Sequence, residues 1–224
     1  MTTLTVRRFA SRAALDAALT ERLEQAIKAA GPSAIMLSGG NTPLPAYRAL
    51  GLRPLPHDEG LHILFSDERY VPADSAASNY HQSRPLLDPL ALAPGSLLRV
   101  RTELPLEQAA ADYEQQLARL LGAGVHIGLG LLGLGADGHT ASLFSDTDLA
   151  AARGHLAIAV HRPDGMYAVS VTPQLLAEVN TLLFVVAGEG KREAVQAFEM
   201  QDANLTASRA VQECRAVELW SSLS

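Results

Sequence analysis

The chain has a single cysteine, Cys214, among its 224 residues. A lone cysteine cannot form an internal disulfide, which excludes a disulfide-rich scaffold and suits a reducing compartment. The first eight residues lack the apolar core of a signal peptide. The apolar stretch from Val125 to Leu134 is interrupted by glycines and is too short to cross a bilayer. We therefore expect a cytoplasmic protein without a membrane partner.

An excess of basic residues is also missing. The 18 Lys and Arg residues face 24 Asp and Glu residues, which gives a formal charge of −6 and no basic cluster for nucleic acid. Disorder is excluded as well, because apolar residues make up 48% of the chain. An acidic protein can still bind an anion where the site itself supplies backbone N–H groups and cations. We find no repeat and no linker, and expect a single α/β domain over residues 1–224.

Short apolar runs alternate with helical patterns along the chain. This alternation predicts an α/β fold with a doubly wound, mostly parallel, open Rossmann-like sheet and helices on both faces. Ligands in such folds lie beyond the carboxyl ends of the strands, so the turns after strands are the candidate sites. The expected strands are 34–37, 61–65, 97–100, 125–132, 156–160, 167–171, 182–186 and 216–220, and the expected helices are 11–30, 78–87, 105–121, 172–179, 191–200 and one that begins at residue 43.

The turn after the first expected strand is rich in glycine and reads Ser-Gly-Gly-Asn-Thr-Pro over residues 38–43. Gly39 and Gly40 allow a ligand to approach the backbone closely, and Pro43 suits the first position of a helix. Free N–H groups near Thr42 would then face an anion. The alternative is an ordinary strand-to-helix turn capped by Thr42. The glycine and lysine spacings of a P-loop or a dinucleotide fingerprint are absent.

A second turn, over residues 66–72, carries Asp67, Glu68 and Arg69 directly after an expected buried strand. A carboxylate here can transfer a proton or orient another group, and an arginine can bind a ligand anion. The alternative is an ion pair of Arg69 with Asp67 or Glu68 that closes the loop.

The third turn, over residues 132–144, places Asp137 and His139 between glycines after the most apolar expected strand. Imidazole titrates near neutrality and can take a proton from water when a carboxylate orients it. Ser142 is expected at the start of a helix, and no Gly-x-Ser-x-Gly motif supports a serine hydrolase. No third ligand beside Asp137 and His139 suggests a metal. The remaining histidines lack this setting: His57, His62, His81, His126, His155 and His161.

Together these turns resemble the 6-phosphogluconolactonase family, which shares a superfamily with glucosamine-6-phosphate deaminases. The resemblance covers about residues 34–195 and implies hydrolysis of 6-phospho-D-glucono-1,5-lactone to 6-phospho-D-gluconate, the second step of the oxidative pentose phosphate pathway, without a cofactor or metal. Deaminases carry a Phe-Asn-Glu run where this chain has Thr-Ala-Ser-Leu-Phe after His139, which favours the lactonase. The matching segments are 38–43, 66–72 with 78–79, 133–144 and, more weakly, 188–191.

Two other functions remain as alternatives to the lactonase. The first is a deaminase or isomerase that acts on glucosamine 6-phosphate. The second is a non-catalytic sugar-phosphate sensor, but about thirty residues with one expected helix precede the first expected strand, too few for a helix-turn-helix module. A monomer or small homo-oligomer is expected in each case.

The resemblance also implies roles for individual residues. His139 is the expected general base on water, with Asp67 or Asp137 as its orienting carboxylate. Arg69 offsets charge on the tetrahedral intermediate or binds the phosphate. The expected phosphate and substrate contacts come from Gly39, Gly40, Asn41, Thr42, Gly138 and Lys191.

The chain departs from the family at two positions. Asn41 stands where a serine is usual, and Tyr167 stands near the position of a usual arginine. Because that arginine is missing, we expect phosphate binding either to depend more heavily on Lys191 and Arg69 or to use Arg162, which would reach the site from the preceding loop.

Overall fold

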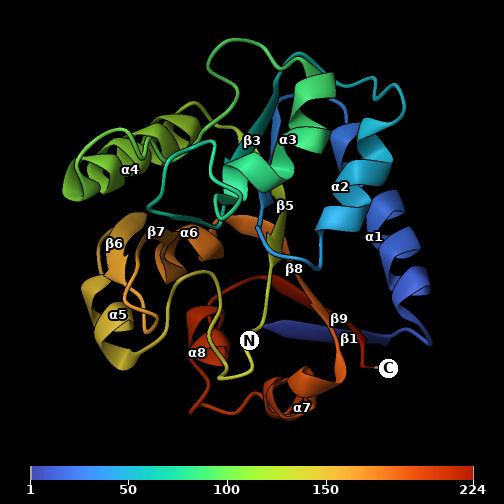
Figure 1. Cartoon of the computed structure of the whole chain (residues 1–224), viewed down its shortest axis with the longest axis vertical. Helices are drawn as coiled ribbons and strands as arrows, with labels where there is room; N and C mark the ends of the chain where they lie inside the picture. Colours follow the sequence, from blue (N-terminus) through green and yellow to red (C-terminus); the bar gives the residue numbers. More distant parts are fainter. Residues whose placement is uncertain (1, 224) are drawn as a thin grey trace.

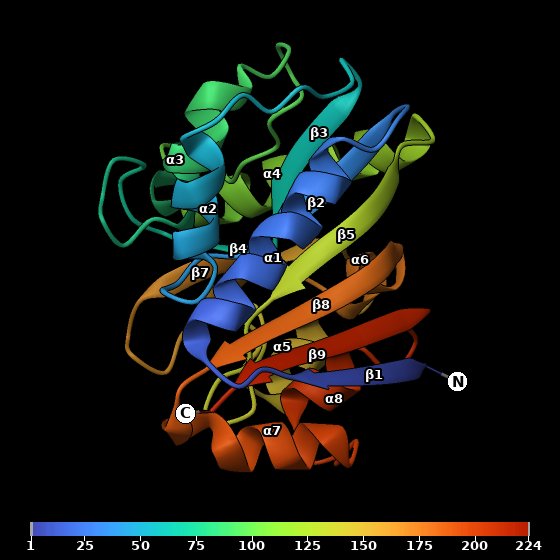
Figure 2. The same cartoon turned by 90° about the vertical axis from the view of Figure 1, so that its right-hand side faces the viewer.

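A computed structural model describes residues 2–223 and contains a central sheet of six strands (Figure 1). Every neighbouring pair in this sheet is parallel. Figure 2 shows the strands of this sheet next to one another, with some helices in front of the sheet and others behind it. The expected doubly wound, mostly parallel, open α/β fold is therefore confirmed. The strands lie in the spatial order β1 (Thr3–Arg8), β9 (Ala216–Ser222), β8 (Val179–Ala187), β5 (His126–Leu132), β2 (Ser33–Leu37) and β3 (Leu61–Phe65).

Helices α1 (Arg12–Ile27), α2 (Leu44–Gly51) and α3 (Asn79–Leu90) cover one face of the sheet. Along α1 the apolar side chains Leu15, Leu19, Leu23 and Ile27 recur every fourth residue and are all buried. This spacing places them in one row along the helix, which packs on the sheet. Alternate residues of β2 and β3 meet them from the sheet side, as the two-residue period of a strand requires.

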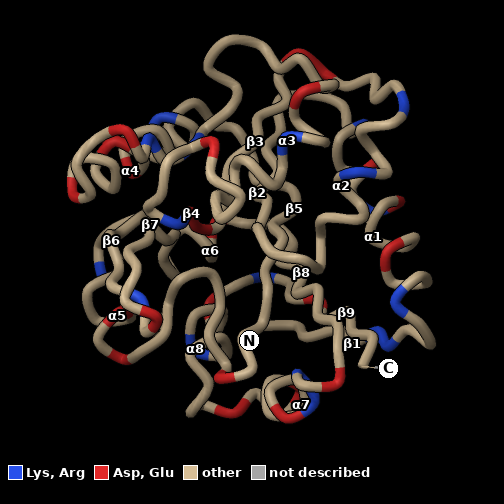
Figure 3. Tube along the Cα trace, in the orientation of Figure 1, with Lys and Arg blue, Asp and Glu red and all other residues tan. Residues whose placement is uncertain are grey.

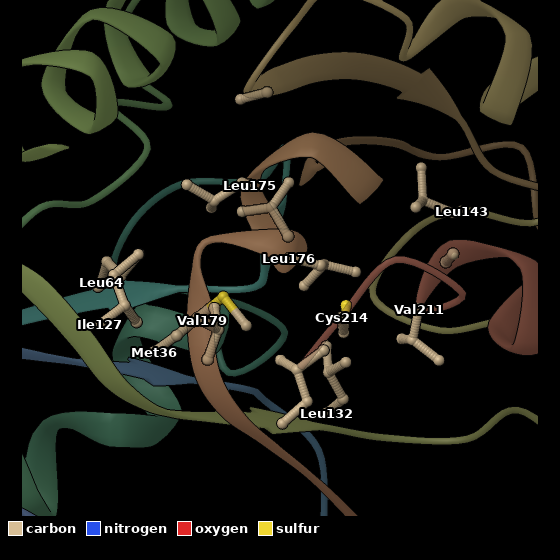
Figure 4. Close-up of a cluster of buried hydrophobic side chains, with 14 of the residues drawn as sticks. Met36, Leu64, Ile127, Leu132, Leu143, Leu175, Leu176, Val179, Val211 and Cys214 are labelled. Carbon is tan, nitrogen blue, oxygen red and sulfur yellow. The ribbon is translucent and has the colours of Figure 1, made fainter. Parts of the chain in front are cut away.

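The opposite face is covered by α4 (Leu106–Gly122), α6 (Pro173–Ala177), α7 (Arg192–Glu199) and α8 (Thr206–Ala210). Figure 4 shows Leu175 and Leu176 of α6 in one group of buried side chains with Leu132 and Cys214. These residues belong to a second apolar cluster that is separated from the first by the sheet. Cys214 is 3% exposed, and burial raises its pKa to about 12, so the thiol stays protonated.

A second sheet of three antiparallel strands lies beside the first, in the order β4 (Asp67–Arg69), β7 (Tyr167–Val171) and β6 (Ala157–His161). The sequence analysis assigned strands 156–160 and 167–171 to the largely parallel sheet, which is wrong. Only residues 162–166 join β6 to β7, and so short a connection makes an antiparallel hairpin, because parallel strands need a longer crossover.

Five short or peripheral elements were not predicted: β1, β4, α5 (Asp146–Ala151), the 3₁₀ helix Glu189–Lys191 and α8. They are short or, in the case of β1, lie at the sheet edge with alternating half-buried residues, so their apolar signal is weak. The expected strand over 97–100 contributes only a bridge between Leu97 and Ile63.

Ser142 does not begin a helix, contrary to expectation. Ala141 has a φ of 49°, in the left-handed region that interrupts a right-handed helix. The helix α5 begins later, after Ser145, whose side chain accepts a hydrogen bond from the Asp148 N–H.

Acidic and basic residues both occur along α1, α4 and α7 (Figure 3). On α1, Arg12 pairs with Asp16, and Glu24 pairs with Lys28 just beyond the end of the helix. Within residues 2–223, none of the helices combines the length and apolar character that a bilayer crossing requires.

Candidate active site

The carboxyl ends of four parallel strands surround a cavity of about 250 Å³. From β2 the chain continues to β3 on one side, whereas β5 and β8 lie on the other side. The turns that follow β2 and β5 therefore diverge, which opens a crevice at the switch point of the sheet. Its lining includes Ser38, Gly39, Gly40, Thr42, Asp67, Arg69, Asn79, Gly135, His139, Arg162 and Lys191. Three expected site residues, Asn41, Asp137 and Gly138, lie outside this lining.

The turn over residues 38–43 approaches α3 more closely than a side chain would allow. A Cβ atom on Gly39 would lie 2.0 Å from Asn79 Oδ1. The next glycine, Gly40, has a φ of 91°, which favours glycine for its backbone. Both glycines are thus required by the fold of the turn, and they bring its backbone to the cavity wall.

Side chains from three helices hold the same turn from outside. Arg12 of α1 donates to the carbonyl oxygens of Asn41 and Thr42, at 3.0 and 2.9 Å. Tyr47 of α2 donates to the Ser38 carbonyl at 2.8 Å. Gln82 of α3 accepts from the Gly40 N–H at 2.9 Å, so that one of the expected anion donors already has a protein partner.

His139 is hydrogen bonded to Asp137 through Nδ1, with 2.5 Å between Nδ1 and Asp137 Oδ1. A carboxylate only accepts, so Nδ1 carries the proton and Nε2 keeps its lone pair. Burial acts to raise the pKa of Asp137, but the hydrogen bond and charge of His139 outweigh burial and lower it. The other side of the ring contacts Phe144, with 4.4 Å between ring centres. A Cβ atom on Gly135 would lie 2.1 Å from His139 Nδ1, so only glycine leaves room for this pair.

Asp67, the other carboxylate considered for His139, is bound by two hydroxyl groups. Ser66 Oγ donates to Asp67 Oδ1 at 2.9 Å, and Ser142 Oγ donates to Oδ2 at 2.7 Å. Asp67 is 8% exposed as a residue and still lines the cavity. Of the two candidates, Asp137 is the one in contact with the imidazole.

Glu68 caps helix α3, a role that the sequence analysis missed. Its carboxylate accepts from the Asn79 and Tyr80 N–H groups at 2.6 and 2.8 Å and from Ser78 Oγ at 3.1 Å. Burial raises the pKa of Glu68 to about 7, although these hydrogen bonds act in the opposite direction. In the sequence, Ser78 and Asn79 mark the start of α3, but they do not indicate which carboxylate accepts hydrogen bonds from the N–H groups of this helix.

Arg69 lines the cavity and donates to the Ala77 carbonyl at 3.1 Å. Among the ion pairs of residues 2–223, none joins Arg69 to Asp67 or Glu68, so the alternative of a loop closed by such a pair is wrong. Lys191, at the end of the short 3₁₀ helix Glu189–Lys191, lines the opposite part of the wall.

Arg162 reaches the cavity from the tip of the β6–β7 hairpin. Its guanidinium donates to Ser142 Oγ at 3.2 Å, pairs with Asp164 at 3.0 Å and lies 5.1 Å from the Phe144 ring centre. Tyr167, in contrast, is 47% exposed, packs against His161 and is not part of the lining. The guanidinium therefore enters from the loop, and not from the start of β7.

Gly138 and Asn41 contribute through their backbones. Gly138 has a φ of 84°, and its carbonyl accepts from the Ala207 N–H at 2.9 Å, which ties the histidine loop to α8. Asn41 is exposed and offers its carbonyl to Arg12. No group of three His, Cys, Asp or Glu side chains arranged to share a metal ion occurs within residues 2–223.

Comparison with known proteins gives consistent matches over most of the chain. Residues 8–220 match the family described as glucosamine-6-phosphate isomerases/6-phosphogluconolactonase. The 6-phosphogluconolactonase of Synechocystis sp. is 38% identical over 79% of this chain and 75% of its own length. The corresponding Nostoc sp. protein is 37% identical over 81% of this chain and 77% of its own length.

Solved structures agree with the sequence matches. The crystal structure of 6-phosphogluconolactonase from Thermotoga maritima superposes with a TM-score of 0.83 at 25% identity, covering 98% of this chain and 100% of the other. A monomeric glucosamine-6-phosphate deaminase superposes with a TM-score of 0.80 at 17% identity, which establishes a common fold alone.

Proposed function

The chain belongs to the glucosamine-6-phosphate isomerase/6-phosphogluconolactonase family, and we propose that it hydrolyses 6-phospho-D-glucono-1,5-lactone to 6-phospho-D-gluconate, the second step of the oxidative pentose phosphate pathway. One observation carries the proposal. An Asp137–His139 pair borders the same cavity as a glycine-rich turn, two arginines and a lysine. A phosphorylated lactone needs both a base and an anion site, and this cavity offers both.

His139 is the general base in this proposal. Its Nε2 lone pair takes a proton from water while the water oxygen bonds to the lactone carbonyl carbon. The tetrahedral intermediate then expels the ring oxygen, which receives that proton from the imidazolium. The product carboxylic acid releases a proton to solvent. Asp137 keeps the proton on Nδ1 throughout and stabilises the imidazolium.

The phosphate lies, in this proposal, between the turn 38–43 and Lys191. The turn supplies backbone N–H groups, and Lys191 and Arg162 supply positive charge. Because Gln82 already occupies the Gly40 N–H, the phosphate either uses other donors of the turn or displaces the amide. Arg69 offsets the negative charge that develops on the carbonyl oxygen.

The lactonase proposal is favoured over a deaminase by the segment that follows His139. Thr140, Ala141, Ser142, Leu143 and Phe144 contain no carboxylate. A cytoplasmic location, a single domain, a monomer or small homo-oligomer and the lack of a nucleic-acid partner stay predictions.

The test is hydrolysis of freshly generated 6-phosphogluconolactone, corrected for its spontaneous decay. Wild-type protein should hydrolyse it, and His139→Ala should lower kcat by at least about 10²-fold, since a positioned general base contributes that much or more. His155→Ala is the matched control, because His155 also contacts a carboxylate, that of Glu114, but on the outside of α4 and away from the cavity. Normal turnover by folded His139→Ala, or ammonia release from glucosamine 6-phosphate by wild type, contradicts the proposal.

A further inference from the structure

The hydroxyl group of Ser142 lies between two charged side chains of the cavity. Its Oγ is 2.7 Å from Asp67 Oδ2 and 3.2 Å from Arg162 Nη1. The three residues come from β4, from the turn after β5 and from the tip of the β6–β7 hairpin, so this contact joins parts of the chain that are far apart in sequence. Ser142 itself is 0% exposed.

The chemistry of the three groups fixes the direction of both hydrogen bonds. A serine hydroxyl has one proton, and a guanidinium has donors but no acceptor. The Ser142 proton must therefore point to Asp67, which leaves an oxygen lone pair facing Arg162. A hydroxyl polarised by a carboxyl group in this way is a better acceptor for the guanidinium.

The backbone holds Ser142 in this position. Its N–H donates to Ser170 Oγ at 3.1 Å, on strand β7. The preceding residue, Ala141, is in the left-handed region, which turns the chain so that the serine points inward. The backbone of Ser142 is thus held to strand β7, whereas Arg162 lies outside the strands, on the five-residue hairpin tip between His161 and Tyr167.

The Arg162 guanidinium also pairs with Asp164 on this tip, and the Asp164 side chain is 44% exposed. That ion pair alone would allow the guanidinium to turn toward solvent with Asp164, since exposed pairs hold their geometry weakly. The contact with Ser142 lies deeper than the pair with Asp164, because Ser142 is fully buried and the Arg162 side chain is 13% exposed.

We infer that Ser142 is a positioning residue that links Asp67 to Arg162 and thereby fixes the Arg162 guanidinium toward the anionic end of the ligand. This inference rests on the proposed function only in taking a phosphate ester as the ligand. Asp67 then acts through Ser142 on Arg162, and Asp137 alone serves the imidazole.

The test is binding of 6-phosphogluconate, and of inorganic phosphate as a simpler probe, measured by titration calorimetry on the full chain. Ser142→Ala should raise the Kd for both about tenfold, as expected when one charge-assisted contact is lost. KM for the lactone should rise by a similar factor, while the pH at half-maximal kcat stays that of wild type, because His139 and Asp137 set it. Ser83→Ala is the matched control: it also removes a fully buried hydroxyl, but one bonded to a backbone carbonyl within α3.

A double-mutant cycle tells positioning from a merely structural effect. Arg162→Gln alone should weaken binding, and adding Ser142→Ala to it should weaken binding no further, because the serine acts through the arginine. Independent, additive losses, or an unchanged Kd for Ser142→Ala, overturn the inference. If Ser142→Ala fails to fold, Ser142→Cys keeps the volume with a much weaker acceptor and should still raise the Kd.

The binding measurements also separate this inference from the proposed function. Wild-type protein that binds 6-phosphogluconate but hydrolyses no lactone would refute the proposed function and leave the role of Ser142 to be decided by the same cycle. A wild-type protein that hydrolyses the lactone but binds neither probe overturns the role of Ser142 and leaves the proposed function standing.

Discussion

Two carboxyl groups near the cavity have pKa values displaced in opposite directions. The His139 contact lowers the pKa of Asp137 against the effect of its burial, whereas burial raises the pKa of Glu68 to about 7. The two side chains also differ in exposure, because Asp137 is 59% exposed and Glu68 is 3% exposed as a residue. The first group serves the imidazole, and the second is part of the structure that supports α3.

Glu68 should therefore make the stability of the protein depend on pH. A carboxyl group with a pKa raised on folding favours the folded state at low pH, and this contribution is lost as pH rises through the folded value. Between about pH 4.5 and pH 7, wild type should lose up to about 3 kcal/mol of unfolding free energy relative to Glu68→Gln, the limit set by the pKa difference.

The measurement is urea unfolding of both proteins across this pH range. Glu68→Gln also loses hydrogen bonds to the N–H groups of α3, which shifts its stability by a constant amount, so only the slope of the difference with pH is compared. The quantity compared is the unfolding free energy of wild type minus that of Glu68→Gln, which should fall as pH rises. A value that rises with pH, or stays flat from pH 4.5 to pH 7, would show that the folded pKa of Glu68 is not raised.

The turn 38–43 depends on the three helices that hold it. Arg12 donates hydrogen bonds to two carbonyl oxygens on its outer side, those of Asn41 and Thr42, and these bonds fix the backbone there. Asp16 in turn holds Arg12, with 2.7 Å between Arg12 Nε and Asp16 Oδ1. An arginine outside the cavity thus supports the turn that we propose binds the phosphate.

Arg12→Ala should raise KM for 6-phosphogluconolactone about threefold to tenfold, because a charged hydrogen bond to the turn is worth about 1.5–3 kcal/mol and this one is partly exposed. Hydrolysis of unphosphorylated gluconolactone should be unaffected, since that substrate does not use the anion site. Arg48→Ala removes an equally charged but exposed side chain from α2 and should leave KM unchanged. Equal effects of Arg12→Ala on both lactones would argue against a role in the anion site.

Residue patterns predicted the long elements and the cavity turns but not the connections between distant residues. The four-residue period of α1 and the apolar runs of β2, β3, β5 and β8 gave the parallel sheet. The short strand β4 and the hairpin that pairs with it were missed or misassigned, because three residues carry no periodic signal and pairing partners are set by tertiary contacts.

The same limit applies to the site. Gly39, Gly40, His139 and Lys191 lie in the connections that follow β2, β5 and β8, so the sheet topology brings them to the same edge. Arg12, Gln82 and Ser142 act through hydrogen bonds to residues 20 or more positions away, and no local pattern indicates such partners. The choice between Asp67 and Asp137 likewise needed the structure, because both carboxylates follow buried strands.

At the scale of the whole molecule, residues 2–223 form two large apolar clusters, one on each face of the central sheet. Leu19 belongs to the cluster under α1, and Leu176 to the cluster under α6, and both are 0% exposed. The sheet backbone separates them, so neither side chain completes the packing of the other.

Leu19→Ala and Leu176→Ala should each lower the unfolding free energy by about 2–5 kcal/mol, through lost burial and a cavity. The double variant should lose the sum to within about 0.5 kcal/mol, because the two sites share no packing partners. Denaturant unfolding monitored by circular dichroism measures all three. A coupling energy well above that margin would mean that the sheet transmits packing changes from one face to the other.

Strand β9 lies between β1 and β8, and pairs with both (Figure 2). Because the chain is synthesised from its N-terminus, β1 leaves the ribosome long before β9, the strand with which it pairs. During synthesis the residues of β1 must therefore wait, unpaired and with an open strand edge, until β9 emerges and fills the place between them. Completion of the sheet is then a late event in biogenesis, and chaperones that shield exposed strand edges have their best opportunity at this end of the nascent chain.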